Sequence, residues 1–326
     1  MKISIYDKNL TRILIIDNQF VSCLWAEGYN TTEQFVLELQ NSDVYKTKIR
    51  PDCYVGRADR NTLMVIKTVE FRDGLIIVTG FTADRVLEDV AFVGTIPENQ
   101  VIPATVKAAY DKSTKHRLLE FADSQISTKY AHQISHKSFS ELCHTMAQET
   151  NLGFRVVKSG GSLSAEFYQG QIRSNAIFAE KYGNLATESI ILSTEIEKNV
   201  AIVLGQGEGD ARVRVTVDLS GGSDKKELIV EASDLQQEEN ETASQYQARL
   251  RARGVEQLLL QKATQECALM VRESDFGVRF DLGDIVTVLL TDYGLKFTAK
   301  IARFSQKEQA NQTETVVEVG DITILR

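Results

Sequence analysis

Proline, tryptophan and long apolar runs are scarce in this chain of 326 residues. It contains three prolines and one tryptophan, while 43% of its residues are hydrophobic and 25% are charged. That balance is typical of a folded globular protein and excludes a collagen-like or proline-rich disordered chain. The longest apolar stretches, such as "GLIIVTGF", are far shorter than the roughly 20 residues that span a membrane. The strand pattern starts at Met1–Ser4, so we expect neither a signal peptide nor a membrane anchor.

Cysteine is sparse and unclustered. The four cysteines never approach the spacing Cys-x-x-Cys; they are Cys23, Cys53, Cys143 and Cys267. A disulfide scaffold needs several bridged cysteines and a zinc ribbon needs closely paired ones, so the pattern favours neither. We expect synthesis in a reducing cytoplasm and no structural metal.

A concentrated basic patch is also missing. The formal net charge is -8 at pH 7, and the lysines and arginines are scattered along the chain. A negative surface without basic clusters makes binding to a phosphate backbone electrostatically unfavourable. We therefore expect no grip on nucleic acid, although a surface that nucleic acid passes without sticking remains compatible with this charge.

The first hundred residues show the alternation of half-buried strands. From Lys2 to about Pro103, short runs such as "KISIYD", "RILIID" and "LMVIKTVEF" alternate apolar and polar residues between turns. The run Leu63–Phe71 is followed by Asp73-Gly74 and then by Leu75–Phe81. Because Asp-Gly supplies the positive φ of a primed turn, this stretch predicts a β-hairpin.

Two later segments favour helices. Ser138 and Glu141 have the spacing of a capping box, apolar residues then recur every three or four positions, and Gly153 offers a left-handed stop. A longer helix is expected from Thr242 to about Val271. At a rise of 1.5 Å per residue it would be about 40 Å long, and Gly254 in its interior could mark a bend.

Strands return between these helices and after them. Runs such as "ESIILSTEI", "VAIVLGQ" and "ARVRVTVDL" precede the second helix, and three further strands follow Phe280. The stretches "VEFRDGLIIVTGF" and "LLTDYGLKFTAKIARF" share a strand, a turn with Gly-Leu and a strand that ends in Phe, which suggests related sheet units at the two ends. We expect a β-rich α+β fold divided into residues 1–103, 104–180, 181–235 and 236–326.

The stretch "FDLGDIVTV" raises the question of a catalytic carboxylate pair. Asp281 and Asp284 flank a glycine just before an expected strand, where aspartate commonly caps a turn by accepting backbone hydrogen bonds. A glycosidase would need a second carboxylate at a defined separation across a cleft, which sequence spacing cannot supply. The pattern favours a structural turn.

Histidines could in principle form a metal site near the first helix. His132 and His136 would share a helical face, with Glu141 and His144 nearby. The segment also alternates like a strand, so solvated histidines are the simpler interpretation. Cys143 and His144 are adjacent, and adjacent side chains point apart on a helix, which disfavours a nucleophile and its base.

Other familiar motifs are incomplete. The loop "VLGQGEGDAR" resembles a phosphate-binding loop, but a strand rather than a helix follows it, so a hairpin loop is expected. Trp25 is best interpreted as a half-buried sheet residue or an interface anchor. No set of residues predicts an active site or a cofactor, and the residues alone indicate a protein that binds or assembles.

Several motifs together resemble one family. The opening "IYDKNLTRILIIDNQFVSCLWAEGYNTTEQFVLEL", then "TGFTADRVLEDV", "EKYGNLATESIILSTEIEKNVAIVLGQGEG" and "DLGDIVTV" occur in the order seen in tail hub proteins of siphophages and prophages. The resemblance is to the siphovirus group called gene product thirty-seven-like, which is similar to the central hub of contractile tails and to the N-terminal part of tail-associated lysins. The matching positions are Asp17, Leu24, Trp25, Tyr29, Phe35, Leu37, Gly80, Arg85, Gly183, Asn184, Leu185, Asn199, Gly205, Gly283, Asp284 and Val286.

That resemblance implies a structural protein without catalytic residues. It implies two small antiparallel β-barrel domains, joined by an α/β insertion and the long helix, with three chains closing a ring at the tip of the virion tail. Such a ring would match a sixfold tail tube to a threefold tip. The implied partners are two further copies, a distal tail ring protein, the tape-measure protein and receptor-binding or tail-fibre proteins, and DNA would transit the bore without specific binding.

Two other functions stay open from the sequence. A tail-associated peptidoglycan hydrolase could use carboxylates such as Glu27 or Asp284. A carbohydrate-binding accessory module would usually expose clustered aromatic residues, whereas this sequence spreads its tyrosines and phenylalanines evenly.

Overall fold

The alternating N-terminal residues form seven strands in the computed structural model of this chain. The structure describes residues 1–185, 190–222, 224–270, 275–310 and 312–325. Alternate side chains such as Ile3, Ile5 and Val55 are fully buried, as expected when one face of a sheet covers a core. The elements are β1 (Lys2–Tyr6), β2 (Arg12–Asp17), β3 (Ser22–Gly28), β4 (Gln34–Gln40), α1 (Asp43–Lys48), β5 (Tyr54–Arg57), β6 (Leu63–Arg72) and β7 (Leu75–Thr82).

The hairpin predicted around Asp73-Gly74 is confirmed. Strands β6 and β7 pair antiparallel along most of their lengths. Asp73 and Gly74 have φ of 52° and 77°, the left-handed values that a primed turn needs.

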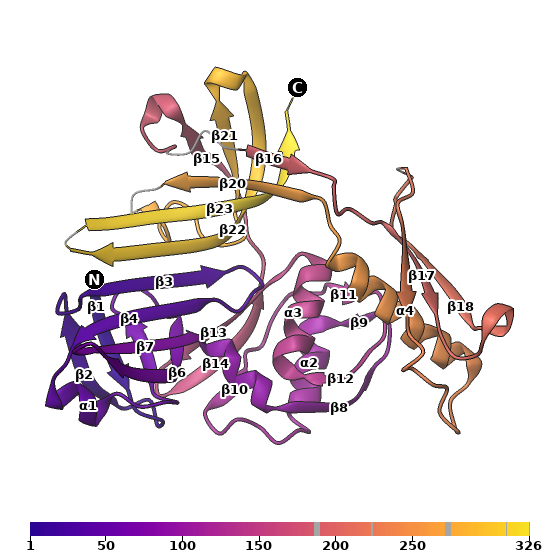
Figure 1. The fold of residues 1–326 in the computed structure, drawn as a ribbon, viewed down its shortest axis with the longest axis horizontal. Coiled ribbons are helices and arrows are strands. Elements are labelled where there is room, and N and C mark those ends of the chain that lie inside the picture. Colours follow the sequence, from indigo (N-terminus) through magenta and orange to yellow (C-terminus); the bar gives the residue numbers. More distant parts are fainter. Residues whose placement is uncertain (186–189, 223, 271–274, 311, 326) are drawn as a thin grey trace.

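The C-terminal strands continue the N-terminal sheet. They are β20 (Thr264–Met270), β21 (Ile285–Leu290), the short helix η5 (Thr291–Tyr293), β22 (Leu295–Gln309) and β23 (Gln312–Ile324). One half of β22 pairs with β21, and the other half pairs antiparallel with β3. In Figure 1, β20, β23 and β22 accordingly lie directly above β3, β4 and β7.

The resulting sheet has the strand order β16-β20-β23-β22-β3-β4-β7-β6-β5-β1-β2, and β15 joins it through β21. The N-terminal and C-terminal strands of this sheet cover one apolar core. It contains Trp25 and Phe35 from the N-terminal strands and Phe297 and Phe304 from β22. The fold is therefore β-rich, as predicted. Hydrogen bonding among the described strands closes no barrel at either end, and the two-barrel description stays a prediction.

The chain segment between β7 and β15 builds a second apolar core. It is built by η1 (Ala83–Asp89), β8 (Ala91–Ile96), β9 (Gln100–Val101), α2 (Ile102–Tyr110), β10 (Leu119–Phe121), β11 (Lys129–Tyr130), β12 (Ile134–Ser138), α3 (Phe139–Thr150), β13 (Gly153–Ser159) and β14 (Ser162–Tyr168). The predicted start of α3 is confirmed, because the Ser138 hydroxyl accepts the backbone N–H of Glu141 at 3.1 Å.

The predicted end of α3 is wrong by two residues. Asn151, with φ of 61°, takes the left-handed position after the helix, and Gly153 begins β13. Asparagine tolerates this conformation because its short polar side chain costs little there. Gly153 serves a different purpose, which is described with the candidate site.

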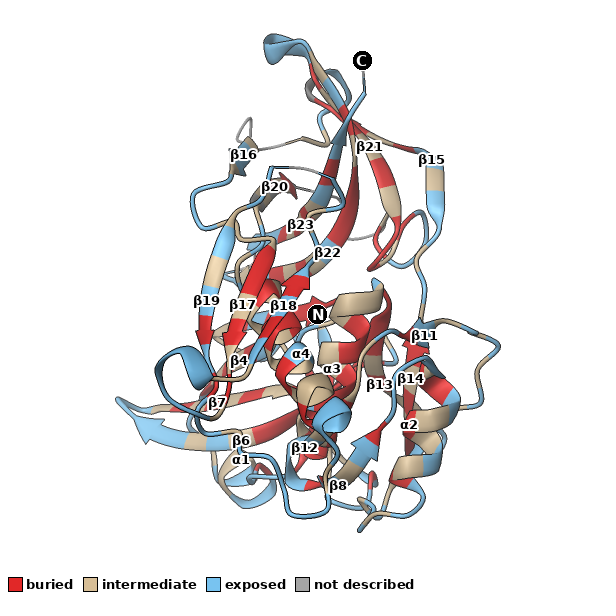
Figure 2. Ribbon diagram, turned by 90° about the vertical axis from the view of Figure 1, so that its right-hand side faces the viewer, coloured by how far each residue is buried: buried red, intermediate tan, exposed pale blue. Residues whose placement is uncertain are grey.

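A third core is built from three strands and one helix. The elements after β14 are β15 (Ile172–Ala179), η2 (Glu180–Tyr182), β16 (Ile190–Ser193), β17 (Val200–Leu204), η3 (Gly209–Ala211), β18 (Arg214–Asp218), β19 (Glu227–Glu231) and α4 (Ala243–Leu259). The middle strand β17 pairs antiparallel with β18, which confirms the predicted hairpin loop between them, and parallel with β19. β17 is buried along most of its length (Figure 2), and α4 covers it (Figure 1).

The predicted long helix is shorter than expected. Helix α4 ends at Leu259 and is therefore about 25 Å long. Residues Thr264–Met270 form β20, which pairs with β16 and β23, and Val271 lies outside the described residues. The spacing of the apolar residues in this stretch fits a helix or a strand. Hydrogen bonds from the neighbouring strands β16 and β23 stabilise the strand. Gly254, expected to mark a bend, is buried where α4 packs on β17 and β18.

Within the described residues, no helix is both long enough and apolar enough to cross a lipid bilayer.

Replacing Gly80 by alanine should destabilise the fold. A Cβ at this position in β7 would lie 2.0 Å from the carbonyl oxygen of Val65 and 2.6 Å from the Phe35 ring. Neither neighbour can retreat easily, so Gly80→Ala should lower the free energy of unfolding by at least about 2 kcal/mol, as measured in urea. Gly161→Ala is the control, because an added Cβ there meets no atom within 4 Å. Equal effects of the two changes would contradict this packing.

Candidate functional site

Three family-motif residues meet at one point in the structure. Tyr29 follows β3, while Gly283 and Asp284 precede β21, at the other end of the chain. Gly283 has φ of 83°, and a Cβ on it would lie 2.1 Å from the Tyr29 ring. Only glycine fits this position, because it adopts the left-handed conformation and leaves room for the ring.

Two further glycines allow close packing beside this ring. A Cβ on Gly153 would lie 2.5 Å from the rings of both Tyr29 and Tyr168, and a Cβ on Gly170 would lie 1.9 Å from the carbonyl oxygen of Gly283. The two tyrosine rings meet edge to face, with centroids 5.3 Å apart. We call the set of Tyr29, Gly153, Tyr168, Gly170 and Gly283 the tyrosine junction, where four separate chain segments come into contact.

Hydrogen bonds hold Tyr29 in this junction. Its hydroxyl donates to the carbonyl oxygen of Asn151 at 3.2 Å and accepts the backbone N–H of Gly170 at 3.4 Å. Its backbone N–H donates to Ala302 on β22 at 2.8 Å. Burial raises the pKa of the phenol, so the group stays neutral and remains a hydrogen-bond donor.

Asp284 fixes the segment that enters β15. Its carboxylate is almost fully buried and accepts the backbone N–H of Gln171 at 2.7 Å, the Nε–H of Arg173 at 2.8 Å and the backbone N–H of Asp281 at 3.0 Å. A carboxylate with these partners caps two turns at once. Asp281 accepts the backbone N–H of Leu282, so the two aspartates behave as the turn-capping pair predicted.

Glu27 occupies a second buried position, on β3. Its carboxylate accepts hydrogen bonds from Trp25 Nε1 at 2.8 Å, from the Thr62 hydroxyl at 2.8 Å and from Arg60 Nη2 at 3.0 Å. The Arg60 guanidinium also lies 4.5 Å from the centroid of the Phe276 ring. Burial alone would lower the pKa of Arg60, but the charge and hydrogen bond of Glu27 outweigh it and raise that pKa.

Arg57 extends this network to β22. Its guanidinium donates to the side-chain oxygen of Gln306, pairs with Asp59 at 2.7 Å and lies 5.7 Å from the Trp25 ring centroid. We call Trp25, Glu27, Arg57, Arg60 and Gln306 the seam network, because they lie where β3 and β22 pair. Sequence reasoning missed its arginines. The available signal was Glu27 itself, which shares the buried, alternating face of "CLWAEG" with Trp25.

The remaining motif positions stabilise local structure. The Arg85 guanidinium covers the Phe81 ring at 4.8 Å and pairs with Glu88. Gly183 has φ of 62°, a conformation suited to glycine, in the turn after β15. Gly80 lies in β7, where its lack of a side chain lets β6 approach.

Two asparagines close loops with their side chains. Asn184 accepts the backbone N–H of Ala179 and donates to the carbonyl oxygen of Ile177, each at 2.9 Å. Asn199 accepts the backbone N–H of Lys226 at 2.7 Å and donates to Asp224 at 2.8 Å. Both mimic backbone pairing, which explains why an asparagine is suited to each position.

A threonine, an aspartate and a histidine also meet, but not as a catalytic relay. Nε2 of His144 lies 2.9 Å from Asp84 and 3.1 Å from the Thr32 hydroxyl, and Nδ1 lies 2.9 Å from the carbonyl oxygen of Asn30. In a relay, the nucleophile and the orienting carboxylate contact opposite ring nitrogens. Here they share one nitrogen, and the group ties α3 to the β3–β4 loop. Burial raises the pKa of the neighbouring Cys143 thiol well above its usual value.

The other histidines are separate from one another. His132 contacts Glu149 at 2.8 Å, and His136 has a left-handed φ of 50° at an irregularity of β12. In the part of the chain that the structure describes, no three His, Cys, Asp or Glu side chains are grouped closely enough to hold a metal ion.

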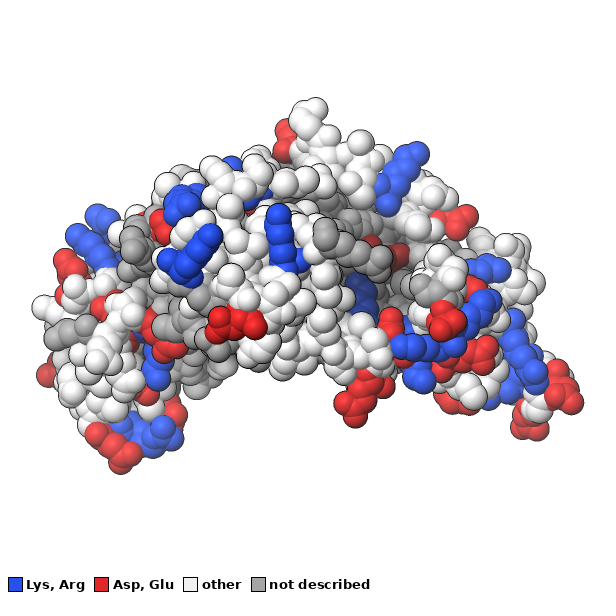
Figure 3. All heavy atoms as spheres, turned by 90° about the horizontal axis from the view of Figure 1, so that it is seen from above, with Lys and Arg blue, Asp and Glu red and all other residues white. Residues whose placement is uncertain are grey.

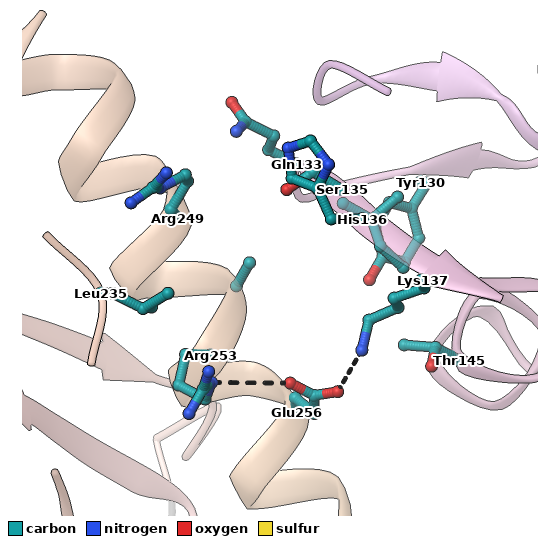
Figure 4. A pocket seen from close by; sticks show the side chains of 12 residues that line it. Tyr130, Gln133, Ser135, His136, Lys137, Thr145, Leu235, Arg249, Arg253 and Glu256 are labelled. Carbon is teal, nitrogen blue, oxygen red and sulfur yellow. Dashed lines mark hydrogen bonds and ion pairs between the residues drawn. The ribbon is translucent and has the colours of Figure 1, made fainter. Parts of the chain in front are cut away.

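A cavity of about 210 Å³ separates β12 from α4 (Figure 4). Lys137 reaches across to Glu256 at 2.6 Å, and Arg253 lies 3.9 Å from the same carboxylate. Arg249 is paired with Glu238 at 2.8 Å. The charged groups are thus neutralised by one another, and the cavity marks a polar contact between two parts of the fold. On the face in Figure 3, basic and acidic groups are likewise intermingled.

Known structures with a similar fold include tail proteins, two of them from prophages. The prophage tail protein gp18 from Listeria monocytogenes EGD-e is 12% identical, with a TM-score of 0.57 over 98% of this chain and 94% of that chain. The 43 kDa tail protein of prophage MuSo2 from Shewanella oneidensis is 13% identical, with a TM-score of 0.57 over 98% of each chain. The tail protein from Neisseria meningitidis MC58 is 12% identical, with a TM-score of 0.59 over 98% and 96%. These likenesses define the fold class.

The family follows from the sequence itself. A family profile described as Siphovirus ReqiPepy6 Gp37-like protein matches residues 83–321, and the chain belongs to that family. No curated protein matches the sequence. The resemblance predicted from the motifs is therefore confirmed. Arg85, Asn184, Asn199, Gly283 and Asp284 lie within the matched residues.

Asp284→Asn should destabilise the protein strongly. The asparagine amide would point an N–H group at one of three hydrogen-bond donors and would leave Arg173 without its counter-charge. We expect the free energy of unfolding to fall by about 2–4 kcal/mol in urea titrations. Asp292→Asn, at an exposed position in η5, should change it by less than about 0.5 kcal/mol. A similar small effect at both positions would show that Asp284 does not anchor the turn.

Proposed function

We propose that this protein is a structural hub at the virion tail tip or baseplate, where three copies close a ring. The observation that carries the proposal is the pairing of β3 with β22, which places a sheet unit from each end of the chain side by side over one apolar core. If each unit acts as a barrel-like module, three chains present six similar modules. Such a ring can dock on a sixfold tail tube and still offer threefold symmetry to the tip.

In this proposal the four segments of the chain have different tasks. Residues 1–103 and 236–326 supply the two ring-forming modules, and residues 104–180 and 181–235 lie between them. The partners are a distal tail ring protein on one side and receptor-binding or tail-fibre proteins on the other. DNA and the tape-measure protein pass through the bore, and a net charge of -8 supports passage without sticking. The chain would be synthesised in the bacterial host cytoplasm.

The environment of the two candidate catalytic carboxylates supports a structural role. Glu27 and Asp284 are both almost fully buried, and each carboxylate accepts three hydrogen bonds from protein groups. A hydrolase needs a carboxyl group that reaches its substrate in a cleft. These two groups instead join chain segments, which is the work of a scaffold.

The assembly state tests this proposal. Native mass spectrometry of the chain, alone and mixed with its distal tail ring protein, should give a species of three times the chain mass. Negative-stain images should show three-lobed rings with a central hole. A stable monomer at every concentration, with no ring in the presence of tail partners, would contradict the proposal.

Zymography on bacterial cell walls provides an independent check. We expect no clearing by the purified chain beside a lysozyme control. Clearing that disappears with Glu27→Gln or Asp284→Asn, while the variants remain folded, would favour a hydrolase instead.

A further inference from the structure

Strand β8 exposes an edge that is unusually ready to pair. β12 occupies one of its edges, and on the other edge the described residues provide no backbone partner. Bare edges in folded proteins are usually protected by charged residues or proline. The sequence of β8, "AFVGTI", contains neither, and the side chain of Val93 is 83% exposed. Strand β8 lies at the lower surface of the molecule in Figure 2.

Two edge strands elsewhere in this chain follow the protective rule. β18 and β19 form the two edges of the three-stranded sheet around β17. β18 begins with Arg214 and ends with Asp218, and β19 begins with Glu227 and ends with Glu231. The uncharged edge of β8 therefore differs from these two charged edges, and it predicts a pairing partner.

A groove of about 700 Å³ runs between this edge and α2. Its strand side is the whole of β8, and its other side carries Thr105, Ala108 and Ala109 on one face of α2 and Lys112 just after the helix. Small side chains on this face leave room for a backbone to lie beside β8. An open strand edge facing a helix across a groove is the geometry in which proteins add an extended peptide as a further strand.

The groove has room for one strand but not for a second copy of this sheet. Neighbouring strands lie about 4.8 Å apart, so an added strand would lie between β8 and α2. In a second copy, β8 carries β12 along its other edge. Pairing β8 with β8 would push that β12 into α2, and the occupant must therefore be a single extended segment.

The charge at one end of the groove indicates the segment's polarity. The short connection of residues 97–101 reverses the chain, so α2 runs back along β8 and Lys112 lies near the start of the strand. Within the described ranges Lys112 makes no ion pair, while Asp89 at the same end is paired with Lys67 at 3.7 Å. An antiparallel added strand, the more stable pairing, would place its C-terminal end there.

We propose that the β8–α2 groove binds an extended segment of a partner polypeptide, which adds antiparallel to β8. The segment carries small or β-branched residues and ends in an acidic group beside Lys112. This inference goes beyond the hub proposal and does not depend on ring formation.

Fluorescence anisotropy with a defined peptide tests the inference. The probe is the fluorescein-labelled heptapeptide Thr-Val-Thr-Val-Thr-Val-Glu with a free carboxyl terminus, titrated with the full chain. We expect saturable binding with a Kd below about 1 mM. The same peptide N-methylated at alternate amides keeps its side chains but loses the backbone N–H groups that would pair with β8. It should not bind. Absence of saturation with the first peptide, or equal binding of both, would overturn strand addition.

Two matched variants locate the site. Ala108→Arg fills the groove and should weaken binding about tenfold or more, whereas Ala104→Arg, exposed on the same helix outside the groove, should leave binding within about twofold. Both positions are exposed, so equal melting temperatures should show that both variants fold. Lys112→Glu should weaken binding of the acidic peptide and strengthen binding of a peptide that ends in lysine amide. The proposed site would be overturned if Ala108→Arg left binding unchanged, or if Ala104→Arg weakened binding as much as Ala108→Arg does.

Discussion

The fold depends on the ladder between β3 and β22, which joins the two ends of the chain over a buried ion pair. Glu27 and Arg60 lie beneath this ladder, and Arg57 meets Gln306 across it. A buried pair contributes little net stability, but removing one partner costs about 3–5 kcal/mol because the other charge is left uncompensated. A shift of β22 by one residue would turn Gln306 away from Arg57 and expose Phe304. The seam network therefore favours one register over its alternatives.

The tyrosine junction complements this seam at the end of the same ladder. Tyr29 leaves β3 and hydrogen bonds to Ala302 of β22, so the junction continues the ladder into the second core. Gly153 and Gly283 leave room for the ring, Gly170 leaves room for the backbone of Gly283, and Asp284 fixes the segment that leads into β15. The demand at the three glycines is steric, since none of them has room for a Cβ. Together the seam and the junction join distant segments of the chain through buried hydrogen bonds and close packing.

Local signals in the sequence predicted local structure well. Asp73-Gly74 predicted a hairpin because the turn geometry depends on two residues alone, and Ser138 with Glu141 predicted the start of α3 for the same reason. Cys267 and Leu269 lie in a stretch whose apolar spacing fits a helix or a strand. It forms a strand because it pairs with β16 and β23, which are distant in sequence. Pairing of residues 22–28 with 303–309 is set by packing across the whole chain, and no local pattern reports it.

The candidate site divides in the same way. The motif resemblance singled out Tyr29, Gly283 and Asp284, and the turn-capping role of Asp284 followed from its spacing to Asp281. Their meeting with Gly153 and Gly170 could not be predicted, because each contact joins segments far apart in the sequence. Arg60, and the contact of His144 with Asp84 and Thr32, were missed for the same reason.

Hydrogen–deuterium exchange of the full chain tests the central role of the seam most directly. The backbone amides of β3 and of residues 303–309 in β22 should exchange together, at the rate of global unfolding, because the two strands protect one another. Rapid exchange of the β22 amides while β3 to β7 stay protected would show that the two ends of the chain open independently. That result would contradict a single sheet held by the seam.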